Sequence, residues 1–228
     1  MRVDVITLFP RSVDEALSES IVGRARSEGF LKLSFLNPRD FSGDRRGTAD
    51  DKPYGGGTGM VMMAEPVYQA LKKAKKKGSF TVLLTPKGRP FTQKLALSLA
   101  KKKRLIFICG HYEGTDERIS TLADLELSVG DYVLTGGEPA ASVVIDAVTR
   151  LIPGVLKKAD ATVKETFTGS LLEAPHYTRP ALWRGKKVPA VLLGGNHASI
   201  DNWRKTKALE LTKKYRPDLI KKVKMEKI

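Results

Sequence analysis

The chain has 228 residues, of which 41% are hydrophobic, and its 40 Lys and Arg residues against 25 Asp and Glu give a net charge of +15. This length suffices for one domain of ordinary size and a small second one, and no apolar run approaches the roughly 18 residues that would span a membrane. The charge favours a polyanionic partner, with nucleic acid ahead of an anionic membrane because no basic helix carries a bulky aromatic face.

The N-terminus and the single cysteine indicate the compartment. Residues 1–10 alternate as a strand does and include the charged Asp4, which is not the pattern of a signal peptide. Cys109 ends an apolar run, so we expect a buried thiol with neither a disulfide nor a cysteine-based metal site. The sequence therefore predicts a soluble protein of the reducing cytoplasm.

Short apolar runs alternate with amphipathic segments along the first two thirds of the chain. In chain order they predict strands and helices at residues 3–9 (strand), 12–28 (helix), 31–36 (strand), 65–76 (helix), 80–84 (strand), 92–102 (helix), 105–109 (strand), 125–134 (strand) and 138–151 (helix). Strand–helix alternation of this kind predicts an α/β domain with a largely parallel sheet.

The periodicity stops after Pro153-Gly154. Residues 157–172 are mostly polar and predict a flexible linker between a first domain, residues 1–156, and a second, residues 173–228. Trp183, Ile200 and Trp203 can seed a small, mainly helical core in the second domain, which is also basic.

Three predicted strands end in corners that contain glycine or proline: Leu84-Thr-Pro-Lys-Gly88, Cys109-Gly-His-Tyr-Glu-Gly114 and Leu134-Thr-Gly-Gly-Glu138. If the strands are parallel, these corners meet at the edge where α/β proteins bind ligands, so they predict one pocket. None matches a dinucleotide or phosphate-binding fingerprint, which disfavours NAD and ATP.

These corners belong to a longer ordered series that resembles the bacterial tRNA (guanine-N1) methyltransferases of the knotted SPOUT family. The series is Asp50-Asp-Lys-Pro-Tyr-Gly-Gly-Gly57, Gly110-His-Tyr-Glu-Gly-Thr-Asp-Glu-Arg118, residues 128–137, Arg150-Leu-Ile-Pro-Gly-Val155, His176-Tyr-Thr-Arg-Pro180 and Gly195-Asn-His197. The resemblance implies a trefoil knot, S-adenosylmethionine as cofactor, tRNA as partner and a homodimer whose active sites lie at the subunit interface.

The resemblance also assigns residues to the cofactor. Those that match the family's cofactor-binding positions are Leu84, Pro86, Gly110, Tyr112, Glu113, Ser128, Val129, Gly130, Tyr132, Leu134, Gly136 and Gly137. Backbone donors and acceptors suit the edge of adenine, and glycine lets the chain approach it closely. Taken alone, the glycines are equally typical of turns, and the tyrosines of core packing.

The resemblance implies the reaction, methylation of N1 of guanosine 37, which lies 3′ of the tRNA anticodon, and two residues are expected to carry it. N1 bears a proton at neutral pH, so the reaction needs a base, and a cation stabilises charge on O6. The resemblance makes Glu165 the base, where the family usually has an aspartate, and Arg150 the cation. The residues alone are equally consistent with a surface pair between Arg150 and Asp146 and with a solvated linker charge at Glu165.

This chemistry demands no metal. The spacing of His111, His176 and His197 also indicates no metal site.

Two alternative functions stay open. One alternative is a knotted methyltransferase with another RNA target, which mapping of the product would identify. The other is an RNA-binding protein that has lost the reaction, which the replacement of aspartate by Glu165 favours.

Overall fold

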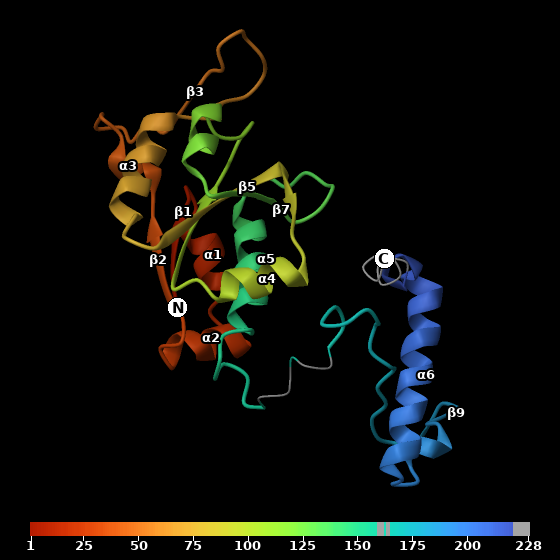
Figure 1. Cartoon of the computed structure of the whole chain (residues 1–228). Helices are drawn as coiled ribbons and strands as arrows, with labels where there is room; N and C mark the ends of the chain where they lie inside the picture. Colours follow the sequence, from red (N-terminus) through yellow and green to blue (C-terminus); the bar gives the residue numbers. More distant parts are fainter. Residues whose placement is uncertain (159–161, 163–164, 221–228) are drawn as a thin grey trace. The chain divides into compact units, whose positions relative to one another are not determined.

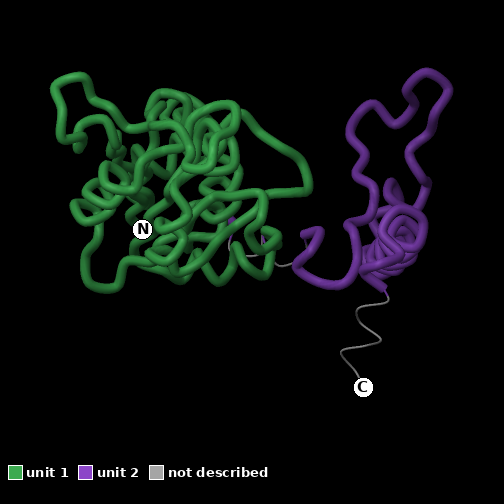
Figure 2. Tube along the Cα trace, turned by 90° about the horizontal axis from the view of Figure 1, so that it is seen from above, with its two compact units in different colours: residues 1–157 green, residues 158–228 purple. Residues whose placement is uncertain are grey.

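The computed structural model describes residues 1–158, 162 and 165–220 (Figure 1). The chain divides into two compact units, residues 1–157 (unit 1) and 158–228 (unit 2), which have different colours in Figure 2. The predicted linker at 157–172 lies partly outside the described residues. Within the described ranges, no helix is long and apolar enough to cross a membrane.

Unit 1 is built on a five-stranded sheet in the order β2-β1-β6-β5-β7. The strands are β1 (Arg2–Ile6), β2 (Lys32–Leu36), β5 (Ser79–Pro90), β6 (Arg104–Cys109) and β7 (Leu125–Ser128). Every neighbouring pair in this sheet is parallel, which confirms the predicted α/β class with a largely parallel sheet. A separate two-residue ladder joins β3 (Asp50–Asp51) to β4 (Val61–Met62).

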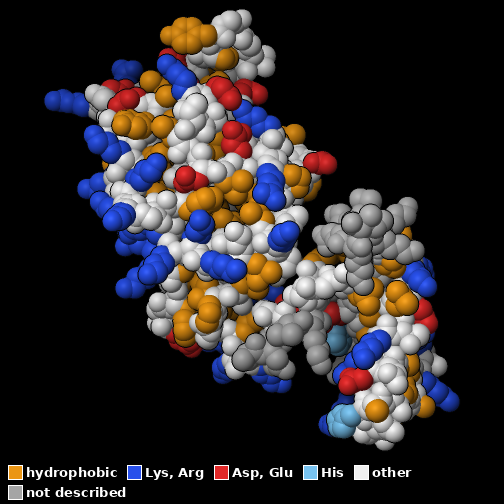
Figure 3. All heavy atoms as spheres, in the orientation of Figure 1, with side chains coloured by type: hydrophobic (Ala, Val, Ile, Leu, Met, Phe, Trp, Pro, Cys, Tyr) orange, Lys and Arg blue, Asp and Glu red, His pale blue; other side chains and the backbone are white. Residues whose placement is uncertain are grey.

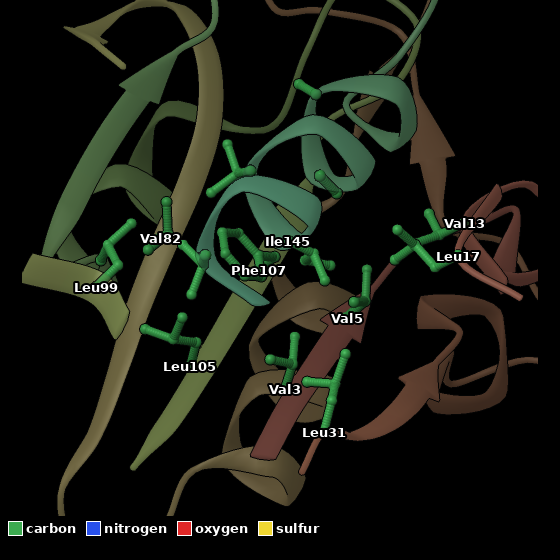
Figure 4. Packing of buried hydrophobic residues seen from close by; sticks show 14 of the residues in the cluster. Val3, Val5, Val13, Leu17, Leu31, Val82, Leu99, Leu105, Phe107 and Ile145 are labelled. Atoms are coloured by element: carbon green, nitrogen blue, oxygen red, sulfur yellow. The ribbon is translucent and has the colours of Figure 1, made fainter. Parts of the chain in front are cut away.

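Helices cover both faces of this sheet, because its central strands are apolar on both sides. Val5 and Phe107 point to one face, where they pack with α1 (Pro10–Ala16), α2 (Ser20–Ser27), α4 (Gln93–Ala100) and α5 (Glu138–Thr149) (Figure 4). Ile106 and Ile108 point to the other face, against α3 (Ala64–Ala74) and the short 3₁₀ helix at Glu117–Leu122.

The helix predicted at residues 12–28 is wrong as one element, because the chain turns between α1 and α2. The carbonyl oxygen of Ser18 lies so close to Gly23 that a Cβ there would be 2.1 Å from it. This close approach lets α1 and α2 both contact α5. The amphipathic pattern continues through the turn because both helices bury their apolar faces in one cluster.

Two predicted strands end earlier than the apolar runs suggest. β1 ends at Ile6, since Pro10 opens α1. β7 ends at Ser128 rather than at residue 134, and the apolar Val133 is 88% exposed in the loop that follows. β5 is longer than predicted and reaches Pro90, with an irregularity between Leu84 and Arg89. That irregularity forms the first of the three corners.

Unit 2 is dominated by one long helix, α6 (His197–Tyr215), which Asn196 caps by accepting a hydrogen bond from the backbone N–H of Ser199. A small hairpin of β8 (Leu182–Trp183) and β9 (Lys186–Lys187) and a 3₁₀ turn at Ala190–Leu192 precede it. The Thr212 hydroxyl of α6 accepts a hydrogen bond of 2.9 Å from the backbone N–H of Leu172, which ties the start of the unit to its helix.

Candidate functional site

A pocket of about 400 Å³ lies at the carboxyl ends of β5, β6 and β7. It is lined by all three glycine- or proline-bearing corners, so the structure brings together what the sequence separates by some fifty residues. The position agrees with the general rule that parallel sheets bind ligands beyond the carboxyl ends of their strands. The volume is that of a site for one small molecule.

All the residues predicted to hold a cofactor line this one pocket: Leu84, Pro86, Gly110, Tyr112, Glu113, Ser128, Val129, Gly130, Tyr132, Leu134, Gly136 and Gly137. The prediction omitted other lining residues from the same corners, notably Thr85, Lys87, His111, Thr115 and Thr135. In the sequence, only their position between the predicted cofactor-binding residues indicates that they line the pocket.

The second and third corners are joined by their backbones. The N–H of Gly137 donates a 2.7 Å hydrogen bond to the carbonyl of Gly110, and His111 forms a β-bridge with Gly136. A Cβ at Gly137 would lie 2.7 Å from Cα of Cys109, and one at Gly136 would lie 2.4 Å from the Glu138 carboxylate. Only glycine permits this contact, which explains the pair of glycines without reference to a turn.

A buried carboxylate lies next to this contact between the second and third corners. Glu138, the first residue of α5, is 3% exposed and accepts a 2.6 Å hydrogen bond from the Thr7 hydroxyl. Its other oxygen is 3.8 Å from Nδ1 of His111, a buried atom for which the described residues provide no hydrogen-bond partner. Burial, and then the charge of Glu138, raise the pKa of the Cys109 thiol well above its usual value. Cys109 is therefore a neutral packing group behind the pocket.

The residue 50–62 segment packs against the second corner. The backbone N–H of Glu113 donates to the carbonyl of Met60 at 3.0 Å, and Val61 forms a β-bridge with Tyr112. Tyr112 has a left-handed backbone (φ 59°), and its hydroxyl lies 3.3 Å from the guanidinium of Arg39. The segment thus holds the backbone of Tyr112, and Arg39 contacts the hydroxyl of this pocket-lining side chain.

One pair of opposite charges lines the pocket, and a second lies beside it in the sequence. Nζ of Lys87 lies 2.6 Å from Glu117, and this hydrogen bond lowers the pKa of the Glu117 carboxyl. Asp116 accepts two hydrogen bonds from the guanidinium group of Arg118 and one from its backbone N–H, and these bonds lower the pKa of the Asp116 carboxyl to about 2. Among the described residues, no group of three or more His, Cys, Asp and Glu side chains is placed to hold a metal ion.

Of the two predicted catalytic residues, Arg150 is not among the residues that line this pocket. Arg150 follows the last turn of α5, whereas Gly137 caps its first turn, and the helix between them spans about 20 Å at 1.5 Å per residue. Glu165 belongs to unit 2, where its carbonyl accepts hydrogen bonds from the N–H and hydroxyl of Thr168 at 3.1 and 2.5 Å. The structure therefore places the predicted cofactor-binding residues around one pocket, and Arg150 is not among them.

Comparison with known proteins gives one consistent result. The family described as "tRNA (Guanine-1)-methyltransferase TrmD" matches residues 1–222. The chain is 53% identical over 222 residues to a "tRNA (guanine-N(1)-)-methyltransferase" of Carboxydothermus hydrogenoformans, covering 97% of this chain and 88% of that protein. Proteins of the same name from Caldanaerobacter subterraneus and Clostridium botulinum are 52% and 50% identical, over 97% and 99% of this chain and 92% and 94% of theirs.

Proposed function

The chain belongs to the tRNA (guanine-1)-methyltransferase family, a SPOUT family, and is an enzyme of that class; from this premise we propose that it methylates N1 of guanosine 37 in tRNA, with S-adenosylmethionine as methyl donor. The observation that carries the proposal is that every residue matched to the family's cofactor positions lines one pocket. A trefoil knot, implied by the family resemblance, is part of the same proposal.

The pocket suits an adenosine-containing ligand. Its corners offer backbone N–H and C=O groups, which can pair with the donor and acceptor edge of adenine, while Leu84, Val129 and Leu134 provide apolar walls. Gly136 and Gly137 remove the side chains that would otherwise fill the junction of the second and third corners. We assign residues 1–156 to this cofactor-binding function.

We assign proton transfer to Glu165 and charge stabilisation to Arg150. S-adenosylmethionine, when bound, supplies a methyl group on a positively charged sulfur, which N1 attacks as the bond from sulfur to carbon breaks. Glu165 takes the N1 proton, and the guanidinium of Arg150 stabilises the negative charge that develops on O6. No metal is required for this proton and charge balance.

The position of Arg150 favours a homodimer with shared active sites. Because α5 places Arg150 about 20 Å along the helix from the glycine pair that opens it, we infer that Arg150 serves a pocket other than that of its own chain. A second copy related by a twofold axis can present its own Arg150 to that pocket, and each copy then completes the other's site.

The partner that we propose is tRNA, in the cytoplasm. The basic residues 173–228 would contact phosphates, with residues 157–172 as linker, and the target base must leave the anticodon-loop stack to reach the methyl group. Incubation of the enzyme with unmodified tRNA and S-adenosylmethionine, followed by mapping of the methylated nucleoside, tests the proposal. Methylation at another nucleotide, or cofactor binding without any turnover, would contradict it.

A further inference from the structure

The edge of the sheet opposite the pocket carries a concentrated positive charge that the pocket does not use. Residues 66–112 contain no Asp or Glu and hold 12 of the chain's 40 Lys and Arg residues. The remainder of unit 1 carries 12 Lys and Arg against 18 Asp and Glu. The basic character of unit 1 therefore comes entirely from this stretch.

The fold gathers most of these charges on one surface. The turn between α3 and β5, the turn between α4 and β6, and the first residues of β1 and β2 all lie where the parallel strands begin. We call this surface the amino-edge patch; it consists of Lys72, Lys73, Lys75, Lys76, Lys77, Lys101, Lys102, Lys103, Arg2, Lys32 and Arg104. Figure 3 shows Lys and Arg side chains along the flank of unit 1 on which α3 lies.

Hydrogen bonds between its segments make the patch continuous. A guanidinium nitrogen of Arg104 donates to the carbonyl of Ala74 at 3.2 Å, which joins the start of β6 to the end of α3. The N–H of Arg2 donates to the carbonyl of Lys103 at 3.0 Å, and the N–H of Lys32 donates to the carbonyl of Met1 at 2.9 Å. Segments far apart in sequence are thus held side by side.

Few of these charges have a structural explanation. Asp4, 2% exposed, lies 3.1 Å from Arg2 and 3.6 Å from Arg104, so it compensates these two guanidinium groups. Lys72 and Lys73 lie in the last turn of α3, where a cation favours the helix dipole. Lys75 and Lys101 are the C-cap residues of α3 and α4, and Nζ of Lys102 lies 4.4 Å from the ring centre of Phe80. None of the lysines at 75–77 and 101–103 forms an ion pair within the ranges that the structure describes.

We propose that the amino-edge patch is a second RNA-binding surface, which contacts the sugar–phosphate backbone of the substrate RNA away from the pocket; the choice of RNA as partner rests on the proposed function. Clustered like charges repel one another and favour a polyanion. Lysine ammonium groups are point charges that suit phosphates but read no sequence. The patch should therefore raise affinity for RNA uniformly, without selecting the methylated nucleotide.

The decisive variant removes three charges from the turn before β5. Lys75→Gln, Lys76→Gln and Lys77→Gln together should weaken binding of unmodified tRNA about tenfold to hundredfold near 0.1 M salt. The slope of log affinity against log salt should fall by about 1 for each lysine that contacts a phosphate. The maximal methylation rate at saturating tRNA and the affinity for S-adenosylmethionine should stay unchanged, because the pocket lies at the other edge.

Three controls make the result specific. The matched variant replaces the exposed Lys52, Lys94 and Lys157 with Gln, and it should lose less than threefold in affinity, because these lysines are dispersed. Arginine at positions 75, 76 and 77 should retain binding. The melting temperature of the patch variant should equal or exceed that of the wild type, because repulsion has been removed.

Several outcomes would overturn the inference. One is a patch variant whose RNA affinity and salt slope equal those of the wild type. Another is an equal loss of RNA affinity in the patch variant and the matched control, because such a loss would reflect net charge alone. A third is loss of binding to phosphatidylserine vesicles with unchanged RNA binding, which would assign the patch to a membrane. If the wild type fails to methylate guanosine but the patch variant still loses RNA binding, the proposed function is wrong and the patch assignment stands.

Discussion

The two units of the chain differ in how they use their apolar residues. Unit 1 buries two clusters, one on each face of its sheet. Among the described residues of unit 2, only Ala208 and Thr212 are buried. Large apolar side chains of unit 2 stay exposed instead, among them Tyr177, Leu182, Trp183, Leu193 and Tyr215. Unit 1 can thus hold a pocket in place by itself, whereas unit 2 leaves large apolar side chains on its surface, as surfaces that bind partners do.

The largest effect that would test this comparison is on stability. Phe107→Ala should lower the free energy of unfolding of unit 1 by about 3–5 kcal/mol, because Phe107 is fully buried in the center of the sheet. Trp183→Ala, which removes a larger but 56% exposed ring from unit 2, should cost less than about 1 kcal/mol. Urea unfolding measures both, and equal losses would show that the units do not differ in this way.

The next effect separates chemistry in unit 2 from binding in unit 1. Glu165→Gln should slow single-turnover methyl transfer at least 100-fold, about 2.7 kcal/mol, because the amide is nearly isosteric but accepts no proton. The affinities for S-adenosylmethionine and tRNA should be unchanged, and Glu165→Asp should keep partial activity. A wild-type rate in the Gln variant would mean that another group takes the proton.

A smaller effect is expected at the pocket itself. Gly136→Val should weaken S-adenosylmethionine binding by at least about tenfold, since its side chain would meet Glu138 and His111. Gly43→Val is the matched control, because a Cβ there has no neighbour within 4 Å. Calorimetry should show wild-type affinity in the control alone. Equal affinities in both variants would mean that the close approach at Gly136 has no role in binding.

The smallest effect concerns one of the two buried residues of unit 2. Thr212→Val should cost about 1 kcal/mol, since the hydroxyl both donates to the carbonyl of Ala208 and accepts from the N–H of Leu172. Hydrogen exchange at the Leu172 amide should then be about fivefold faster. Thr206→Val, which alters an exposed hydroxyl on the same helix, should leave that rate unchanged.

Much of unit 1 could be predicted because its sequence pattern and its burial agree. The alternating apolar residues of β1, the continuous apolar run of β6 and the helical spacing in α5 reflect faces that are buried in the structure. The pattern failed where apolar residues serve another purpose. Val133 extended the predicted strand, yet it lies in a pocket loop, and the turn between α1 and α2 was hidden because both helices bury their faces in one cluster.

The site was predictable in part, for a different reason. Parallel strands place their ends together, so three distant corners predicted one pocket, and the structure assembles them. The buried contact of Thr7 with Glu138 was not predictable, because it joins residues that no local pattern relates. For Arg150, the motif series gave a role, but only the structure gives its distance from the pocket along α5.

That length of α5 has a consequence for genetics. If each pocket takes its arginine from the other copy, two variants that are each impaired alone, Arg150→Ala and Gly136→Val, should complement each other when mixed. In a mixed pair, one site combines an intact pocket with an intact arginine, and the other site lacks both. Because of this twelve-residue helix, each active site would depend on residues of both copies, so a substitution at position 150 in one copy would lower the activity of the pocket in the other.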